Sequence, residues 1–102
     1  NSFFRFLEVD SLVVGYIYGV IKKVGENEKG WKSIADLNSL VVLPSYRKKG
    51  YATFMIKEFF SYLRSKNITY VTVSSNVKNK NSITLLKKLG FQEQYLMLGK
   101  IL

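Results

Sequence analysis

A basic turn between an apolar strand and an amphipathic helix holds the residues best suited to chemistry. Arg47, Lys48 and Lys49 form the turn, and Gly50 and Ala52 stand at the start of the helix. A helix N-terminus leaves backbone N–H groups unpaired and carries a partial positive charge, so a phosphate binds there without a dedicated side chain. The sequence therefore predicts a phosphate-binding turn, and the alternative is a solvated helix cap. The phosphate-loop pattern GxxxxGK[ST] is absent.

Two residue types that are common in enzyme sites are missing. The 102 residues include no cysteine and no histidine, so thiolate nucleophiles, the Ser-His-Asp triad and the usual zinc ligands are excluded. We therefore expect no metal centre. Any chemistry has to use carboxylates, tyrosines, lysines, water or backbone amides.

The net charge of +9 lies entirely in the second half of the chain. Residues 1–43 hold five basic and five acidic side chains, whereas residues 44–102 hold eleven basic and two acidic ones. A basic half favours an anionic partner such as nucleic acid, an acidic membrane or a polyphosphate cofactor. The alternative is a solvated surface that keeps the protein in solution.

Hydropathy patterns predict strands in the first half and helices in the second. Aromatic and β-branched runs between turn residues are typical of strands, and apolar residues spaced by three and four are typical of a helix face. The predicted elements are strands at 3–9, 12–23, 31–43 and 68–74, a polar loop at 25–30, a helix from 50 to 67, a helix capped by Asn81 or Ser82 that ends before Gly90, and one or two short strands at 91–102.

This order, β-β-β-α-β-α-β, predicts a mixed α/β sheet in one domain, 1–102. A strand-helix-strand unit in an otherwise antiparallel set requires one right-handed parallel crossover. No apolar run approaches the roughly 20 residues that span a bilayer, so we expect a cytoplasmic chain without a membrane partner. Packing is the expected role of the large aromatic residues Trp31, Phe54, Phe59, Phe60 and Tyr62.

Two motifs in the second half carry a family resemblance. The run Arg47-Lys48-Lys49-Gly50-Tyr51-Ala52 matches the pattern R/Q-x-x-G-x-G/A, after a strand that ends V-x-P. The segment from Asn79 to Phe91 is similar to N-x-x-A-x-x-L-Y-x-K-x-G-F. Both patterns belong to the GCN5-related N-acetyltransferases (GNAT family), which the chain resembles from Phe3 to Leu102. The family's first strand and first two helices have no counterpart before Phe3.

The resemblance implies a binding site for acetyl-CoA. In this family the cosubstrate enters between the fourth and fifth strands, and its pantetheine arm pairs with the fourth strand, here Leu40, Val41 and Val42. The pyrophosphate would lie on the amides of Arg47, Lys48, Lys49, Gly50, Tyr51 and Ala52. Asn79 would hydrogen-bond the pantetheine, and Lys88 would face the phosphates.

The implied reaction is direct transfer of an acetyl group from the thioester to a primary amine. Asp36 lies on the cofactor strand, where several family members carry a glutamate, and is the expected general base acting through water. The alternative for Asp36 is a solvated carboxylate, with Glu8 and Glu28 as replacement bases. Leu86 stands where the family often has a tyrosine acid, so Tyr51 or Tyr95 would have to substitute.

Three classes of function remain open from the sequence. The leading interpretation is an N-acetyltransferase that acts on a small-molecule or peptide amine. The second is a non-catalytic CoA-binding module or trimmed subunit, which Leu86 favours. A basic nucleic-acid-binding domain is the third, less favoured because the basic residues are not interleaved with aromatic residues on one sheet face. The exposed strands of the first half also predict a homodimer interface.

Overall fold

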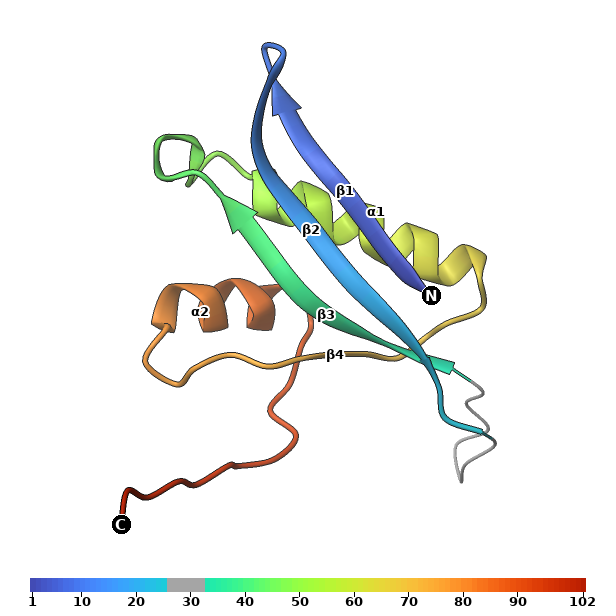
Figure 1. Cartoon of the computed structure of the whole chain (residues 1–102), viewed down its shortest axis with the longest axis vertical. Helices are drawn as coiled ribbons and strands as arrows, with labels where there is room; N and C mark the ends of the chain where they lie inside the picture. Colours follow the sequence, from blue (N-terminus) through green and yellow to red (C-terminus); the bar gives the residue numbers. More distant parts are fainter. Residues whose placement is uncertain (26–32) are drawn as a thin grey trace.

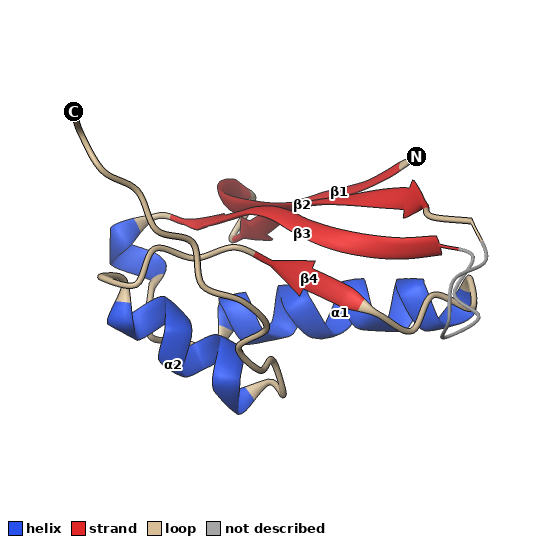
Figure 2. Cartoon of the chain, turned by 90° about the horizontal axis from the view of Figure 1, so that it is seen from below, coloured by secondary structure: helices blue, strands red, loops and turns tan. Residues whose placement is uncertain are grey.

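The computed structural model describes residues 1–25 and 33–102 and contains one sheet with two helices. The sheet has the strand order β1-β2-β3-β4, and both helices lie beneath it in Figure 2. The elements, drawn in Figures 1 and 2, are β1 (Ser2–Val9), β2 (Leu12–Lys23), β3 (Ser33–Val42), the 3-10 turn η1 (Pro44–Tyr46), α1 (Tyr51–Ser65), β4 (Val71–Val73) and α2 (Lys80–Lys88). The predicted mixed α/β fold is confirmed.

β1 and β2 form the predicted hairpin. Asp10 and Ser11, with φ of 51° and 67°, make its turn. Left-handed φ at both central residues matches the twist of a two-residue hairpin. β2 pairs antiparallel with β1 and with β3, and each of these two ladders has one irregularity of register. Of the loop predicted at 25–30, residues 26–30 lie outside the described residues, Glu28 among them, and so does the predicted strand start at Trp31.

β3, α1 and β4 form the predicted crossover, because β3 and β4 pair in parallel. The apolar face of α1 buries Met55, Ile56, Phe59 and Leu63 against the sheet. Phe59 is fully buried, and an added Cβ on Gly19 of β2 would lie 2.3 Å from its Cζ atom. A side chain at position 19 would therefore collide with the centre of the core.

The second helix begins earlier than predicted. Its N-cap is Asn79, not Asn81 or Ser82, because the Asn79 Oδ1 atom accepts a hydrogen bond from the Ser82 N–H at 3.3 Å. Gly90 follows the helix with a φ of 97°, as a C-terminal glycine should. The strand predicted at 68–74 is reduced to the three residues of β4.

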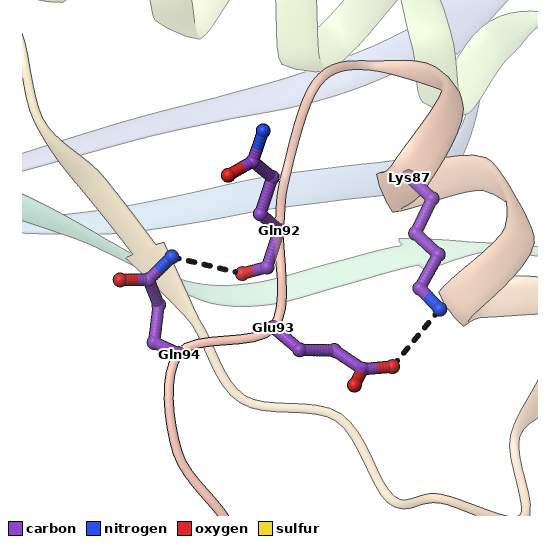
Figure 3. Close-up of polar contacts among 4 residues, drawn as sticks. All are labelled: Lys87, Gln92, Glu93 and Gln94. Carbon is purple, nitrogen blue, oxygen red and sulfur yellow. Dashed lines mark hydrogen bonds and ion pairs between the residues drawn. The ribbon is translucent and has the colours of Figure 1, made fainter.

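The short strands predicted at 91–102 are wrong, since no strand is found among these residues. The segment leaves α2 and runs away from the sheet (Figures 1 and 2). Figure 3 shows its polar contacts: Lys87 pairs with Glu93 at 2.9 Å, and the Gln94 side chain donates to the Gln92 carbonyl at 3.2 Å. A strand forms only where it pairs with the edge of another strand, and β4 has only three residues.

Within the described residues, no helix is long and apolar enough to cross a membrane.

Candidate functional site

The second half of β3 has a free edge. β4 pairs with Ala35, Asp36 and Leu37 only, so β3 continues alone on that side from Asn38 to Val42. β3 and β4 lie side by side where they pair and then diverge (Figure 1). η1 and α1 follow directly from the end of β3. An open strand edge next to a helix N-terminus can bind an extended ligand that ends in an anion.

The backbone of this edge has a defined orientation. The Leu43 N–H donates to the Val14 carbonyl of β2 at 2.8 Å, and the Val41 carbonyl lies against Gly15 of β2. Because amide groups alternate along a strand, those of Leu40 and Val42 face the free edge. Of the three residues expected to bind the pantetheine, Leu40 and Val42 therefore present their amides there, whereas Val41 faces β2.

Arg47 is fixed to the end of this edge. Its Nε donates to the Val42 carbonyl at 2.9 Å, and its backbone N–H donates to the Pro44 carbonyl at 3.3 Å. Next to it, Lys49 lies over the Tyr46 ring, with its Nζ 5.7 Å from the centroid. The cation of Arg47 is thus held between the β3 edge and the turn that leads into α1.

The N-terminus of α1 is open. Gly50 is the N-cap with a φ of 83°, no side chain caps the helix, and no acidic residue stands in the first turn. A Cβ built on Gly50 meets no atom within 4 Å. The N–H groups of the first turn, including those of Tyr51 and Ala52, have no intrahelical acceptor. This end of α1 can therefore accept an anion from solvent.

Asp36 lies where β3 and β4 part. It is half-buried, opposite Thr72 in the parallel ladder, and its Oδ1 accepts a hydrogen bond from the Thr72 hydroxyl at 2.8 Å. Glu8, one of the replacement bases, is exposed near the end of β1. Sequence reasoning missed Thr72, because the register between two strands is not readable from either strand alone.

The two site residues predicted near α2, Asn79 and Lys88, lie in different places. Asn79 uses its Oδ1 to cap α2, which leaves its Nδ2 as a donor. Lys88 lines an open groove of about 480 Å³ with Lys57, Phe60 and Arg64, along the middle and end of α1. The structure thus places Lys88 beside the body of α1, not at the basic turn before it.

Neither Tyr51 nor Tyr95, the two candidate acids, has a described contact with the free edge of β3. Leu86 is buried in the core, and its carbonyl accepts from the Phe91 N–H at 3.0 Å. Tyr95 is exposed in the C-terminal segment, while Tyr51 packs against the core at the start of α1. Among the described residues, no group of three acidic side chains is placed to hold a metal ion.

The comparison with protein families identifies the family of the chain. Residues 1–91 match the model of the acetyltransferase (GNAT) family. The chain belongs to the GNAT family. The matched range includes the free edge of β3 and the two segments that carry the motifs, Arg47 to Ala52 and Asn79 to Phe91.

Curated relatives extend well beyond the matched region. An uncharacterised N-acetyltransferase of Methanocaldococcus jannaschii is 27% identical over 92 residues, which are 90% of this chain and 40% of that protein. The N-acetyltransferase 9-like protein of Schizosaccharomyces pombe is 35% identical over 66 residues, 59% of this chain and 31% of that protein. The chain thus spans less than half the length of either relative.

Solved structures of the GNAT family share the fold. The aminoglycoside acetyltransferase AAC(6')-Iy, in complex with a bisubstrate analogue of CoA and acetylneamine, aligns with a TM-score of 0.82 at 19% identity, over 98% of this chain and 69% of that chain. AAC(6')-IG from Acinetobacter haemolyticus aligns with a TM-score of 0.76 at 21% identity, over 99% of this chain and 71% of that one. These identities establish a common fold.

Proposed function

We propose that the chain binds acetyl-CoA and transfers its acetyl group to a primary amine. The observation that carries this proposal is the free edge of β3 beyond Leu37, which leads directly to the open N-terminus of α1. That edge suits the amide-containing pantetheine arm, and the helix end suits the pyrophosphate. The bisubstrate complex of a structural neighbour, which contains CoA, supports the same cosubstrate.

Each part of the cosubstrate has a proposed partner. The amides of Leu40 and Val42 pair with the pantetheine, and Asn79 donates to it from its Nδ2. The amides of Gly50, Tyr51 and Ala52 hold the pyrophosphate, with Arg47, Lys48 and Lys49 supplying charge. Lys88 lies with Lys57 and Arg64 along the body of α1, so we do not assign it to the pyrophosphate at the basic turn. The basic second half of the chain suits a ligand with several phosphate charges.

The proposed chemistry uses one carboxylate and the backbone. Asp36 takes a proton from the acceptor ammonium through water, and the neutral amine attacks the thioester carbonyl. One of the two edge N–H groups, that of Leu40 or that of Val42, stabilises the oxyanion that forms, while the other edge amide groups pair with the pantetheine. The C–N bond forms and the C–S bond breaks, so the sulfur leaves as CoA thiolate. The extra proton on the attacking nitrogen passes through water to this thiolate, which leaves a neutral amide and CoA. Leu86 has no proton to give, so the leaving group departs without a side-chain acid at that position.

A small-molecule or peptide amine is the proposed acceptor. The bisubstrate analogue in a neighbouring structure contains acetylneamine, which supports a small polar amine. We also propose a cytoplasmic location, which suits the intracellular supply of acetyl-CoA, and a homodimer. A panel of neamine, spermidine, a lysine peptide and a peptide with a free N-terminus tests the acceptor class.

The binding test uses two substitutions of Gly50 that differ only in charge. Position 50 has left-handed φ and open space, which both Asp and Asn tolerate. In isothermal titration, Gly50→Asn should keep the affinity of the chain for acetyl-CoA and CoA within a few-fold. Gly50→Asp places a carboxylate where the pyrophosphate lies and should weaken binding by at least about tenfold. Equal affinities of the two variants would show that the pyrophosphate does not bind at this turn.

Leu86 favours one alternative, a CoA-binding module without catalysis. That module would bind acetyl-CoA as above but release no CoA with any amine of the panel. The nucleic-acid alternative predicts binding that weakens steeply with salt and does not compete with CoA. A coupled assay of CoA release distinguishes the acetyltransferase from both alternatives, because only the acetyltransferase releases CoA with an amine of the panel.

A further inference from the structure

Asp36 and Thr72 are neighbours at the fork between β3 and β4. The parallel pairing runs through Ala35↔Val71, Asp36↔Thr72 and Leu37↔Val73 and then ends. Paired residues of a parallel ladder project on the same face, so the carboxylate and the hydroxyl lie side by side one residue before the strands part. This is also where the free edge of β3 begins.

The hydroxyl of Thr72 has two acceptors and one proton. Asp36 Oδ1 is 2.8 Å from Thr72 Oγ1, and the Ala35 carbonyl oxygen is 3.4 Å away. The shorter bond, to an ionised acceptor, is the stronger. Within the described residues Asp36 has no ion pair and no second hydrogen bond, so its Oδ2 is left to accept from another group.

We propose that Thr72 is the positioning residue for Asp36 in acetyl transfer. Thr72 is β-branched and paired in a strand, so its χ1 angle, and with it the position of its hydroxyl oxygen, is restricted. The bond fixes one carboxylate oxygen and leaves the other to accept from the water or acceptor ammonium of the proposed reaction. The efficiency of a general base depends on such alignment. This inference rests on the proposed role of Asp36 in the GNAT reaction.

Substitutions of Thr72 separate its hydroxyl from its shape. Thr72→Val removes the hydroxyl and keeps the branched side chain, and Thr72→Ser keeps the hydroxyl. With the best acceptor of the amine panel, Thr72→Val should lower kcat about tenfold, the equivalent of losing one hydrogen bond to a charged group. Thr72→Ser should retain kcat within about threefold, and the KM for acetyl-CoA should be unchanged in both. Thr72→Ala is the second hydroxyl-free variant if Thr72→Val melts early.

A double-mutant cycle with Asp36→Asn tests whether Thr72 acts through Asp36. In the Asp36→Asn background, Thr72→Val should change kcat less than about twofold, because the base it positions is gone. The same tenfold loss in both backgrounds, or loss of activity in Thr72→Ser, would overturn the proposal. Failure of the proposed function looks different: the unaltered chain would then acetylate no amine of the panel.

Discussion

Asp36 is a half-buried carboxylate where β3 and β4 separate, and replacing it tests whether this carboxylate is the general base of the proposed reaction. Asp36→Asn keeps the size of the side chain and its ability to accept from Thr72. We expect kcat/KM to fall about 100-fold at neutral pH, the lower range for loss of a general base. Titration with acetyl-CoA should give the same affinity as the unaltered chain. Undiminished kcat/KM would exclude Asp36 from the mechanism.

Glu93 provides a pH-dependent test of the C-terminal segment. The hydrogen bond and the positive charge of Lys87 hold the pKa of the Glu93 carboxyl below its ordinary value of 4.5. A lowered pKa in the folded state means that the pair stabilises the fold above pH 4.5 and stops doing so as the pH falls through the lowered pKa. Both side chains are largely exposed, so the effect is small.

Melting curves of Glu93→Gln measure this contribution. The variant should melt slightly below the unaltered chain at pH 7, and the difference should disappear as the pH falls through the lowered pKa of Glu93. Glu58→Gln is the control, because Glu58 has no ion pair within the described residues. A difference between Glu93→Gln and the unaltered chain that persists or grows at low pH would contradict the assignment.

At the scale of elements, Phe59 of α1 packs directly against Gly19 of β2, a residue without a side chain. Gly19→Ala would place a Cβ 2.3 Å from the Phe59 ring, which is fully buried. We expect this overpacking to lower the free energy of unfolding by about 1–3 kcal/mol. Gly99→Ala is the matched control, since its added Cβ meets no atom within 4 Å. Urea unfolding of both variants makes the comparison, and equal midpoints would mean that the helix and sheet are not packed this closely.

The sequence predicted some helices and strands correctly and others incorrectly. Pro44, the basic turn and the apolar spacing of α1 depend on local chemistry, so the start of α1 at Tyr51 agrees with the predicted start near Gly50. The cap of α2 was misplaced, because several polar residues precede the helix and only the hydrogen bond from Ser82 identifies Asn79. A strand at 91–102 was wrong, because a strand needs a partner edge as well as a pattern.

At the scale of the molecule, four aromatic side chains gather on the face of the sheet opposite α1. Phe4 stacks on Tyr16 at 5.6 Å between centroids and meets Phe6 edge-on at 5.0 Å, while Tyr18 lies 6.1 Å from Phe4. Phe6 is 64% exposed. We call these four residues the aromatic face. Exposed apolar patches of this kind are typical of interaction sites, and this one is the interface we propose for the homodimer.

Light scattering at micromolar concentration should give twice the chain mass of 11.8 kDa. Phe6→Ser, on the aromatic face, should shift the mass to that of a monomer. Val77→Ser is the control, because Val77 is 74% exposed but lies in the loop between β4 and α2. A monomeric mass for the unaltered chain would contradict the proposed homodimer.

The sequence by itself determined the order of the elements up to α2, the parallel crossover, the basic turn at the start of α1 and the family. These follow from local periodicity, from Pro44 and Gly50, and from residues close together in the chain. Only the tertiary structure decided that Leu40 and Val42 present their amides to the free edge, and that Thr72 lies beside Asp36, 36 residues away. Strand register and bulges cause this difference, because they depend on pairing between distant segments that no local pattern encodes.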